Sequence, residues 1–399
     1  MIDVVTIGLG YIGLPTSALM ATKGKKVLGV DIDQDVVDTI NNGDIHIIEP
    51  ELDIVVKKSV DEGNLIASTT AEQAQVYLVV VPTPFKGDHE PDISYIEKAT
   101  QGIIPLLKKG DLYILESTSP VGTTEKMQEM IFAQRPELKN KIYMAYCPER
   151  VLPGNVMHEL VHNDRVIGGV NKASTQKAIL FYSSFVEGTL HPTDAKTAEM
   201  CKLVENASRD VQIAFANELS LICDKSGINV WDLIKLANKH PRVNILQPGC
   251  GVGGHCIAVD PYFLTTSFPD VSKIIKEARK VNNNKSFWCV NKIEKEIMDF
   301  VLKNKRNPIL ALCGLAFKPN VNDLRQSPAK LIVNKVIQEK DPNNFRIVEP
   351  NIQEHHEFKL YSFEDAVSES DIVVFLVAHN EFSLSKATNK KTLNFCNVK

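Results

Sequence analysis

Short apolar runs alternate with amphipathic segments through the first ~120 residues of the chain. The runs are continuous and rich in Val, Ile and Leu, which is typical of parallel strands buried on both faces of a sheet. A glycine turn and a helical pattern follow the first run. This alternation predicts a doubly wound α/β sheet. Strands are expected at VVTIGLG (4–10), KVLGVDID (26–33), YLVVVPTP (77–84), DLYILEST (111–118) and IYMAY (142–146), with a helix at 11–24.

The middle of the chain has a helical pattern without a strong strand signal. One long helix is expected over residues 194–226, where no proline interrupts the pattern, and Gly227 should end it. Further helices are expected at 230–239 and 271–304. Strand signals return at 307–317, 345–350 and 371–378, with a helical stretch at 327–339.

We therefore predict two Rossmann-like doubly wound domains joined by a central helical region that contains a long helix. The expected division is an α/β domain at 1–193, a central helical domain at 194–304, and a second, smaller α/β domain at 305–399. A chain of 399 residues is too long for one ordinary core, which agrees with several domains.

Composition places the chain among globular proteins, because 44% of its residues are hydrophobic and 24% are charged. A net charge of −4 argues against nucleic-acid or polybasic membrane binding. No apolar run approaches the ~18–20 residues of a membrane helix, and the N-terminus begins directly in a strand pattern without a basic leader. A cytoplasmic location is expected, in which the eight scattered cysteines are reduced.

The segment GLGYIG (8–13) predicts a dinucleotide site. Gly8 allows a tight turn, Gly10 lets the backbone approach a pyrophosphate, and Gly13 allows close packing of helix on strand. The pyrophosphate is expected at the helix N-terminus. Asp31 ends the second strand, where a carboxylate binds ribose hydroxyls and repels a 2′-phosphate, so NAD is the expected cofactor. Tyr11 and Ile12 complete the predicted turn.

Three more polar residues follow predicted strands. Thr83 and Thr118 come after the third and fourth strands, and Glu149 comes after IYMAY. In an open α/β sheet ligands bind at the carboxyl ends of strands. Each threonine alone could be an ordinary turn residue, but together with the glycine turn they are expected to line the cofactor.

The stretch GCGVGGHCIAVD (249–260) combines glycines with reactive side chains. Cys250, His255 and Cys256 lack the spacing of a metal site, and no metal is expected. A disulfide is improbable in a reducing compartment, and the GxxxxGK[ST] phosphate loop is absent. Two interpretations stay open for Cys256: a thiolate nucleophile in a flexible cradle, or an inert buried thiol. Asp260 before Pro261 could be a helix N-cap, a catalytic residue, or both.

Several further polar residues are candidates for a site. Lys202 and Asn206 share a face of the long helix at i, i+4, although a polar helix face is ordinarily just solvated. Arg242 lies in HPRVN (240–244). Lys318 and Arg325 follow the first strand of the last domain, where basic residues suit a diphosphate or are ordinary surface charges.

These motifs, in this order and over essentially the whole chain, resemble the nucleotide-sugar 6-dehydrogenases, the UDP-glucose/UDP-N-acetylhexosamine/GDP-mannose dehydrogenase superfamily. The combination is far more specific than any one motif. The residues that carry the resemblance are GLGYIG (8–13), VPTPFKGDHEPD (81–92), ESTSPVG (116–122), CPERVLPG (147–154), AEMCKLVEN (198–206), HPRVN (240–244), GVGGHCIAVDP (251–261) and GLAFKPNVNDLRQSP (314–328).

The resemblance implies oxidation of a sugar C6 hydroxyl to a carboxylate with two NAD. Cys256 is then the nucleophile, which adds to the aldehyde as a thiohemiacetal and becomes a thioester for hydrolysis. Lys202 steadies the developing oxyanion, with Asn206 beside it. Asp260 and Glu149, with a water near Thr118, handle proton transfer and hydrolysis.

The resemblance also implies the roles of the three domains: NAD binding at 1–193, dimerisation and the active site at 194–304, and UDP-sugar binding at 305–399. It further implies the ligand contacts. Lys318 and the glycine stretch around Gly253 are expected to contact the UDP-sugar, and Arg325 to lie near the cofactor. A homodimer is expected, in which Arg242 reaches the partner's site. Arg150 and Val151, together with Lys202 and Asn206, are further expected substrate contacts.

One departure from the glucose enzymes bears on the substrate. They carry lysine directly before the aspartate, whereas Val259 holds that place in this chain. The variant resembles the N-acetylhexosamine branch, and UDP-N-acetyl-D-mannosamine is the expected substrate, with UDP-N-acetylglucosamine and UDP-glucose as alternatives. The product is expected to serve bacterial surface polysaccharide such as capsule. A two-electron hydroxyacid dehydrogenase and a catalytically silent nucleotide-sugar binder are the alternatives from other classes.

Overall fold

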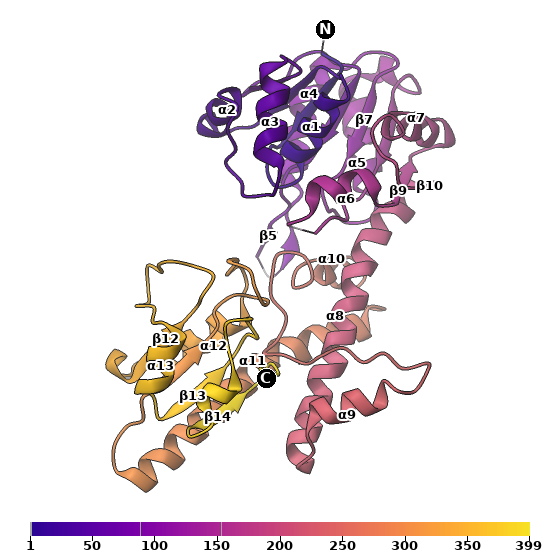
Figure 1. Ribbon diagram of the computed structural model, residues 1–399. Coiled ribbons are helices and arrows are strands. Elements are labelled where there is room, and N and C mark those ends of the chain that lie inside the picture. The colour runs from indigo at the N-terminus through magenta and orange to yellow at the C-terminus, as the bar shows by residue number, and fades with distance from the viewer. Residues whose placement is uncertain (1, 88, 153) are drawn as a thin grey trace. The chain divides into compact units, whose positions relative to one another are not determined.

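The computed structural model describes residues 2–87, 89–152 and 154–399, which form two compact units, Met1–Glu205 and Asn206–Lys399 (Figure 1). Each unit has its own sheet and its own core. The boundary falls inside the long helix α8 (Ala195–Ser226), which ends where Gly227 adopts a φ of +68°. A left-handed residue of this kind commonly ends a helix, and glycine adopts it without steric cost.

The first unit contains an eight-stranded sheet in which neighbouring strands are parallel, except that β8 and β9 are antiparallel. Six strands follow the order β3-β2-β1-β4-β7-β8, which is the dinucleotide-binding order 3-2-1-4-5-6. The strands in spatial order are β10 (Leu190–Asp194), β9 (Arg165–Gly169), β8 (Tyr143–Tyr146), β7 (Leu112–Leu115), β4 (Val76–Val79), β1 (Val4–Ile7), β2 (Val27–Val30) and β3 (Leu65–Ser68).

Helices cover both faces of this sheet, which explains the continuous apolar runs. Successive side chains of a strand point to opposite faces, so Val4 joins one core and Val5 the other. One core includes residues of α1 (Gly13–Thr22), α2 (Gln34–Asn41), α3 (Leu52–Asp61), α6 (Val156–His162) and α7 (Lys172–Tyr182); the other includes residues of α4 (Ser94–Ile103) and α5 (Thr123–Gln134). A short hairpin of β5 (Phe85–Lys86) and β6 (Glu90–Pro91) follows β4.

The second unit contains the rest of α8 and a parallel four-stranded sheet in the order β12-β11-β13-β14 (Figure 1). Its strands are β11 (Leu310–Cys313), β12 (Phe345–Val348), β13 (Ile372–Phe375) and β14 (Lys391–Asn394). Residues of α11 (Lys273–Asn304) and α12 (Pro328–Ile337) pack on one face, and α13 (Phe363–Glu369) packs on the other. The remaining helices are α9 (Val230–Ala237) and α10 (Asp260–Ser267).

A buried polar contact joins α8 to α11. Arg279 Nη1 lies 2.6 Å from Asp210 Oδ1, and both side chains are almost fully buried. Asn282 donates to the same carboxylate at 2.7 Å and accepts from Asn217 at 2.9 Å. Asn282 and Asn283 offset part of the desolvation of this pair, while Asp210 Oδ2 and Arg279 Nε make no hydrogen bond within the described residues.

The predicted fold class is confirmed: two doubly wound parallel sheets occur with a helical region and a long helix between them in sequence. The helices expected at 194–226, 230–239, 271–304 and 327–339 correspond to α8, α9, α11 and α12. Strands β3, β9, β10 and β14 are not predicted by the apolar pattern. Three of them lie at sheet edges, where side chains need not be apolar on both faces. Among the described residues, no helix is long and apolar enough to cross a bilayer.

Candidate functional site

Two glycines of the turn after β1, Gly8 and Gly13, are required by the fold itself. The third, Gly10, is not required by the packing of the chain. Gly8 has a φ of +95°, and a Cβ there would lie 2.4 Å from Val80 O. A Cβ on Gly13 would lie 1.8 Å from Gly8 O, whereas a Cβ on Gly10 would meet nothing within 4 Å. The chain therefore keeps open space above Gly10, as a site for a pyrophosphate at the N-terminus of α1 requires.

Asp31, directly after β2, is anchored to the same turn. Its Oδ2 accepts from Leu9 N–H at 2.9 Å, and its Oδ1 accepts from Asp33 N–H at 3.1 Å. Asp33 in turn caps α2 through Asp35 N–H. The carboxylate is thus oriented beside the glycine turn, where it can accept bonds from ribose hydroxyls.

Thr83 and Thr118 meet at the ends of neighbouring strands β4 and β7. Thr83 Oγ1 donates to Thr118 O at 2.7 Å. The segment after Thr118 is held by Glu199 of α8, which is fully buried. The Glu199 carboxylate accepts from Gly122 N–H at 2.5 Å, Thr124 N–H at 2.8 Å and the Thr124 hydroxyl at 2.7 Å, and so caps α5.

Glu149 follows β8, and α8 holds its loop through the main chain. Lys202 Nζ donates to Glu149 O at 2.6 Å. Three residues further along α8, Glu205 pairs with Arg150 at 2.9 Å and 3.1 Å. Within the loop, Val151 N–H donates to the Glu149 carboxylate. The long helix therefore holds the carbonyl of this acid and the side chain of the residue that follows it.

Burial raises the pKa of Glu149 to about 7, against the lowering influence of Lys202 and Arg165. A carboxyl group with this pKa can take up or release a proton near neutral pH, as general acid–base catalysis requires. Glu116 adds to the upward shift. It is itself buried, with Tyr182 Oη donating to it at 2.5 Å and Arg165 lying 3.8 Å away.

In the second unit, the glycine stretch is anchored at its start by α8, α11 and the small sheet. Gly249 N–H donates to Asn217 Oδ1 at 2.9 Å, and Ser286 Oγ donates to Cys250 O at 2.8 Å. The Cys250 thiol donates to Leu376 O at 3.2 Å. Cys250 is buried, so it holds the stretch in place from inside the core.

Further along, the glycine stretch packs against the loop that follows β11. A Cβ on Gly253 would lie 2.5 Å from Gln326 O, and one on Gly254 would lie 2.9 Å from the Phe317 ring. Gly254 N–H also donates to Arg325 O at 3.1 Å. Glycine is required at both positions because the two segments approach too closely for any side chain.

Cys256 lies where the glycine stretch turns into α10. Its carbonyl accepts from Val259 N–H at 3.0 Å and Asp260 N–H at 2.8 Å. Asp260 is buried, and its Oδ2 accepts from Asn206 Nδ2 at 2.5 Å. Cys256 and Asp260 thus lie on one segment, which Asn206 of α8 anchors through the Asp260 carboxylate.

The expected N-cap role of Asp260 is wrong by one position. Helix α10 begins at Asp260 itself, and its N-cap residue is Val259. The bond from Asp260 N–H to Cys256 O starts the helix earlier than the Asp-Pro pair suggests. The Asp260 carboxylate therefore serves Asn206 rather than a cap.

Three basic side chains predicted for ligand binding are exposed: Arg242, Lys318 and Arg325. Arg242 belongs to a loop closed by reciprocal bonds between Asn238 and Ile245 at 2.9 Å and 2.8 Å. Arg325 pairs with Asp323 at 2.7 Å. Within the described ranges, no three His, Cys, Asp or Glu residues cluster closely enough to hold a metal. Asp88 of VPTPFKGDHEPD and Pro153 of CPERVLPG lie outside the described residues.

Some residues that shape the site are not marked by any sequence motif. Glu49 is buried and accepts from Gly154 N–H at 2.9 Å and Val156 N–H at 2.8 Å, and so holds the far end of the Glu149 loop. No local pattern marks it, because its partners lie more than 100 residues away. Glu349 and His379, by contrast, follow strands β12 and β13. The strand-end rule that singles out Glu149 applies to them as well.

Comparison with known proteins agrees with this geometry. Residues 2–186, 196–284 and 311–395 match the NAD binding domain, the central domain and the UDP binding domain of the UDP-glucose/GDP-mannose dehydrogenase family. A UDP-N-acetyl-D-mannosamine dehydrogenase of Campylobacter jejuni is 52% identical, with 98% of each chain covered.

A relative from Ralstonia nicotianae, an NDP-N-acetyl-D-galactosaminuronic acid dehydrogenase, is 50% identical over 94% of this chain and 90% of its own. The solved structure of a UDP-D-ManNAc dehydrogenase from Pyrococcus horikoshii has a TM-score of 0.88 at 36% identity, covering 100% of this chain and 96% of that one. The chain therefore belongs to the UDP-glucose/GDP-mannose dehydrogenase family and carries its NAD-binding, central and UDP-binding domains.

Proposed function

We propose that this protein oxidises the C6 hydroxyl of UDP-N-acetyl-D-mannosamine to the carboxylate, with two NAD per sugar. The observation that carries the proposal is the hydrogen bond from Gly254 N–H to Arg325 O. It connects the glycine stretch that leads to Cys256 with the loop that carries Lys318 and Arg325. This contact places the segment of the proposed nucleophile, Cys256, against the UDP-binding domain. The high identity with the Campylobacter jejuni relative supports the choice of sugar.

The residues around the first glycine turn fit NAD. The open space above Gly10 accommodates a pyrophosphate, and Asp31 accepts bonds from ribose hydroxyls. Gly8, Tyr11, Ile12, Gly13, Thr83, Thr118 and Arg325 are the further residues proposed to hold the cofactor. Bound NAD supplies the hydride acceptor for the alcohol and aldehyde oxidations.

Cys256 supplies the covalent step of the proposed reaction. Its thiolate adds to the C6 aldehyde, which forms a C–S bond and a thiohemiacetal. Loss of hydride from C6 then leaves a thioester, and water cleaves the C–S bond to release the acid and the thiol. Asn206 and Asp260 are proposed to serve the same carbon, since Asn206 of α8 binds Asp260, which lies four residues after Cys256.

Proton transfer and charge stabilisation are assigned to residues at the ends of β7 and β8 and on α8. Glu149 is proposed as the acid–base group, because its pKa of about 7 suits both directions of transfer. Lys202 steadies the oxyanion, and Thr118 positions the hydrolytic water. Arg150, Val151, Gly253 and Lys318 complete the proposed substrate contacts.

We further propose three functional parts, at 1–193, 194–304 and 305–399, and a homodimer built on the central part. Apolar side chains are exposed there, including Phe215 at 56% and Ile274 at 74%, and these residues line one hollow between α8 and α11. A second copy that covers this hollow would remove them from water. Arg242 is exposed on a closed loop and is proposed to reach the partner's site. A cytoplasmic enzyme that supplies a uronic acid for surface polysaccharide is the proposed setting.

A substrate panel tests the function. The purified protein is offered the UDP forms of N-acetylmannosamine, N-acetylglucosamine, N-acetylgalactosamine and glucose with NAD, and NADH is counted per sugar consumed. Two NADH from UDP-N-acetylmannosamine are expected. One NADH would indicate a two-electron dehydrogenase, none would indicate a silent binder, and turnover of another sugar alone would refute the substrate assignment.

A Cys256→Ser variant tests the thioester. Acid formation should fall by at least ~10³-fold because the alcohol is a far weaker nucleophile than a thiolate, while NAD affinity stays within about twofold. Unchanged acid formation would refute the covalent mechanism.

A further inference from the structure

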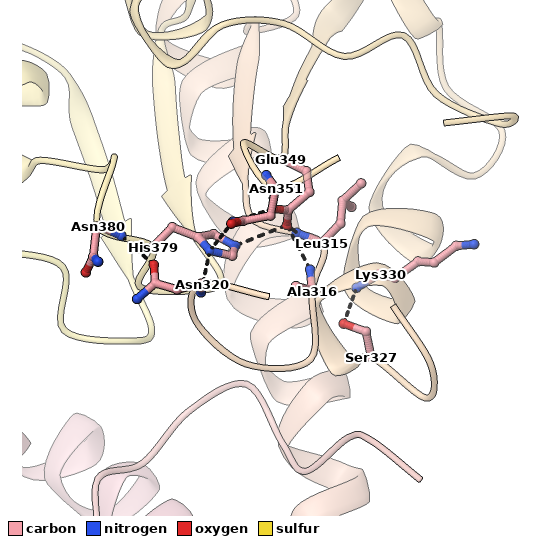
Figure 2. A network of polar contacts seen from close by, with 9 residues as sticks. All are labelled: Leu315, Ala316, Asn320, Ser327, Lys330, Glu349, Asn351, His379 and Asn380. Atoms are coloured by element: carbon pink, nitrogen blue, oxygen red, sulfur yellow. Dashed lines mark hydrogen bonds and ion pairs between the residues drawn. The ribbon is translucent and has the colours of Figure 1, made fainter. Parts of the chain in front are cut away.

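Glu349 and His379 meet at the carboxyl ends of β12 and β13, beneath the loop formed by residues 314–327 (Figure 2). Both side chains are buried, at 3% exposure each. The loop runs from the end of β11 to the start of α12 and carries Lys318 and Arg325. Motif analysis assigns neither buried residue a role.

The Glu349 carboxylate is surrounded by donors. Its Oε2 accepts from the backbone N–H groups of Leu315 at 2.7 Å and Ala316 at 2.9 Å, and from His379 Nε2 at 3.1 Å. Its Oε1 accepts from the backbone and side-chain nitrogens of Asn351 at 3.1 Å and 3.2 Å. Burial alone would raise the pKa of Glu349, but these bonds outweigh burial and hold its pKa at about 2.

The imidazole of His379 has one tautomer consistent with its partners. Its Nδ1 lies 3.0 Å from Asn320 N–H and 2.9 Å from Asn351 Nδ2, and both of these groups are donors. Nδ1 therefore carries no proton, and Nε2–H donates to Glu349. Glu349 is the titratable group that is hydrogen-bonded to the His379 ring. The other contacts of the ring, among the described residues, are with the uncharged Asn320, Asn351 and Phe382.

The pair holds the tip of the loop in a strained conformation. Asn320 has a φ of +59°, in the left-handed region that a non-glycine residue rarely adopts. Its N–H is bound by His379, and its Oδ1 accepts from Asn380 N–H at 2.9 Å. Loss of the imidazole would leave the Asn320 N–H without this acceptor and release this end of the loop.

The same loop fixes the glycine stretch. Phe317 N–H donates to Asp323 O at 3.1 Å, which closes the loop behind Lys318. The Phe317 side chain packs against Gly253 and Gly254. A loop released at Asn320 would therefore change both the position of Lys318 and the support of the segment that leads to Cys256.

We propose that Glu349 and His379 are positioning residues that hold the 314–327 loop in the conformation that binds the UDP diphosphate and orients the Cys256 segment. The inference rests on the proposed function, because it assigns Lys318 to the nucleotide sugar.

Two substitutions of His379 test the role kinetically. In His379→Phe all three hydrogen bonds of the ring are lost, and KM for the UDP-sugar should rise about tenfold or more, with a smaller change in kcat. In His379→Asn the Oδ1 can still accept from Asn320 N–H, so KM should recover in part.

A matched control separates positioning from general stability. Ser362 caps α13 in the same unit through Asp365 N–H and has no contact with the loop among its hydrogen bonds in the described residues. Ser362→Ala should lower the melting temperature and leave KM unchanged. If Ser362→Ala raised KM as much as His379→Phe at equal loss of stability, the positioning role would be refuted.

Measuring UDP binding directly tests the positioning role separately from the proposed function. Calorimetry with UDP alone should show about tenfold weaker binding to His379→Phe than to the wild type, and amide exchange should become faster in peptides over 314–324 and 250–258. If the wild type binds UDP but oxidises no sugar, the proposed function fails and the positioning role stands on the UDP result. Equal UDP affinity in wild type and His379→Phe, or failure of the wild type to bind UDP, overturns the inference.

Discussion

Replacement of Glu199 by Gln should show how α8 supports the cofactor loop. The Glu199 carboxylate is fully buried and accepts three bonds, from Gly122 N–H, Thr124 N–H and the Thr124 hydroxyl. Burial raises the pKa of this carboxyl group, and the three bonds act against that rise. With a backbone donor on each oxygen, the group accepts as a carboxylate at neutral pH.

The side-chain amide of the Glu199→Gln variant has one acceptor oxygen, so its NH₂ group must face a backbone N–H. One buried donor then loses its partner, at a cost of about 1–3 kcal/mol. Loss of the negative charge at the N-terminus of α5 adds about 0.3–1 kcal/mol. Together these terms predict a loss of about 1–4 kcal/mol in the free energy of unfolding.

Urea unfolding followed by circular dichroism measures this loss, and NAD titration by calorimetry measures the functional effect. NAD affinity should fall several-fold, because Gly122 belongs to the segment that follows Thr118. Glu125→Gln is the matched control: it also removes one negative charge near the N-terminus of α5, but Glu125 is only half-buried and pairs with Lys196. If both variants unfolded within ~0.5 kcal/mol of each other, the capping role of Glu199 would be refuted.

Three further predictions follow from the geometry. Gly8→Ala should destabilise the protein, because the added Cβ meets Val80 O at 2.4 Å, whereas Gly10→Ala should keep wild-type stability and weaken NAD binding. Calorimetry on both variants measures the two effects, and an equal loss of stability in both would contradict the prediction. Glu149→Gln should remove the limb near pH 7 from the pH profile of kcat, because its carboxyl group has a pKa of about 7; a limb that persists would assign it to another group. Glu349 has a folded-state pKa of about 2 against an ordinary 4.5, so its stabilising contribution is complete above pH 4.5 and is lost as the pH falls toward 2. In urea unfolding at a series of pH values, the stability of Glu349→Gln should therefore vary less than that of the wild type over this window, and an equal pH dependence in both would contradict the assignment.

Many of the strands and helices can be predicted from the local pattern of apolar and polar residues. The strands buried on both faces, β1, β2, β4 and β7, are continuous apolar runs because each side chain enters one of two cores. Edge strands lack this constraint. In β10 the sequence is LHPTD, with a proline and mostly exposed side chains, and it pairs with β9 through the backbone.

The site shows the same division. The glycine turn is predictable because its requirements arise within a few residues: a positive φ at Gly8 and close packing at Gly13. The local pattern predicts the start of α10 one residue too late, because a cap depends on which bonds the preceding turn makes. Here Cys256 O accepts from Asp260 N–H, and the helix begins at Asp260.

The sequence by itself determined the type of each long element, the dinucleotide turn and the set of polar residues at strand ends, because these features depend on side-chain period and local backbone conformation. The tertiary structure alone decided the partners of the buried acids. Glu199 reaches Thr124 across 75 residues, Asn206 reaches Asp260 across 54, and His379 reaches Glu349 across 30. Such contacts carry no local pattern, since a buried carboxylate is stable only beside donors that folding brings to it.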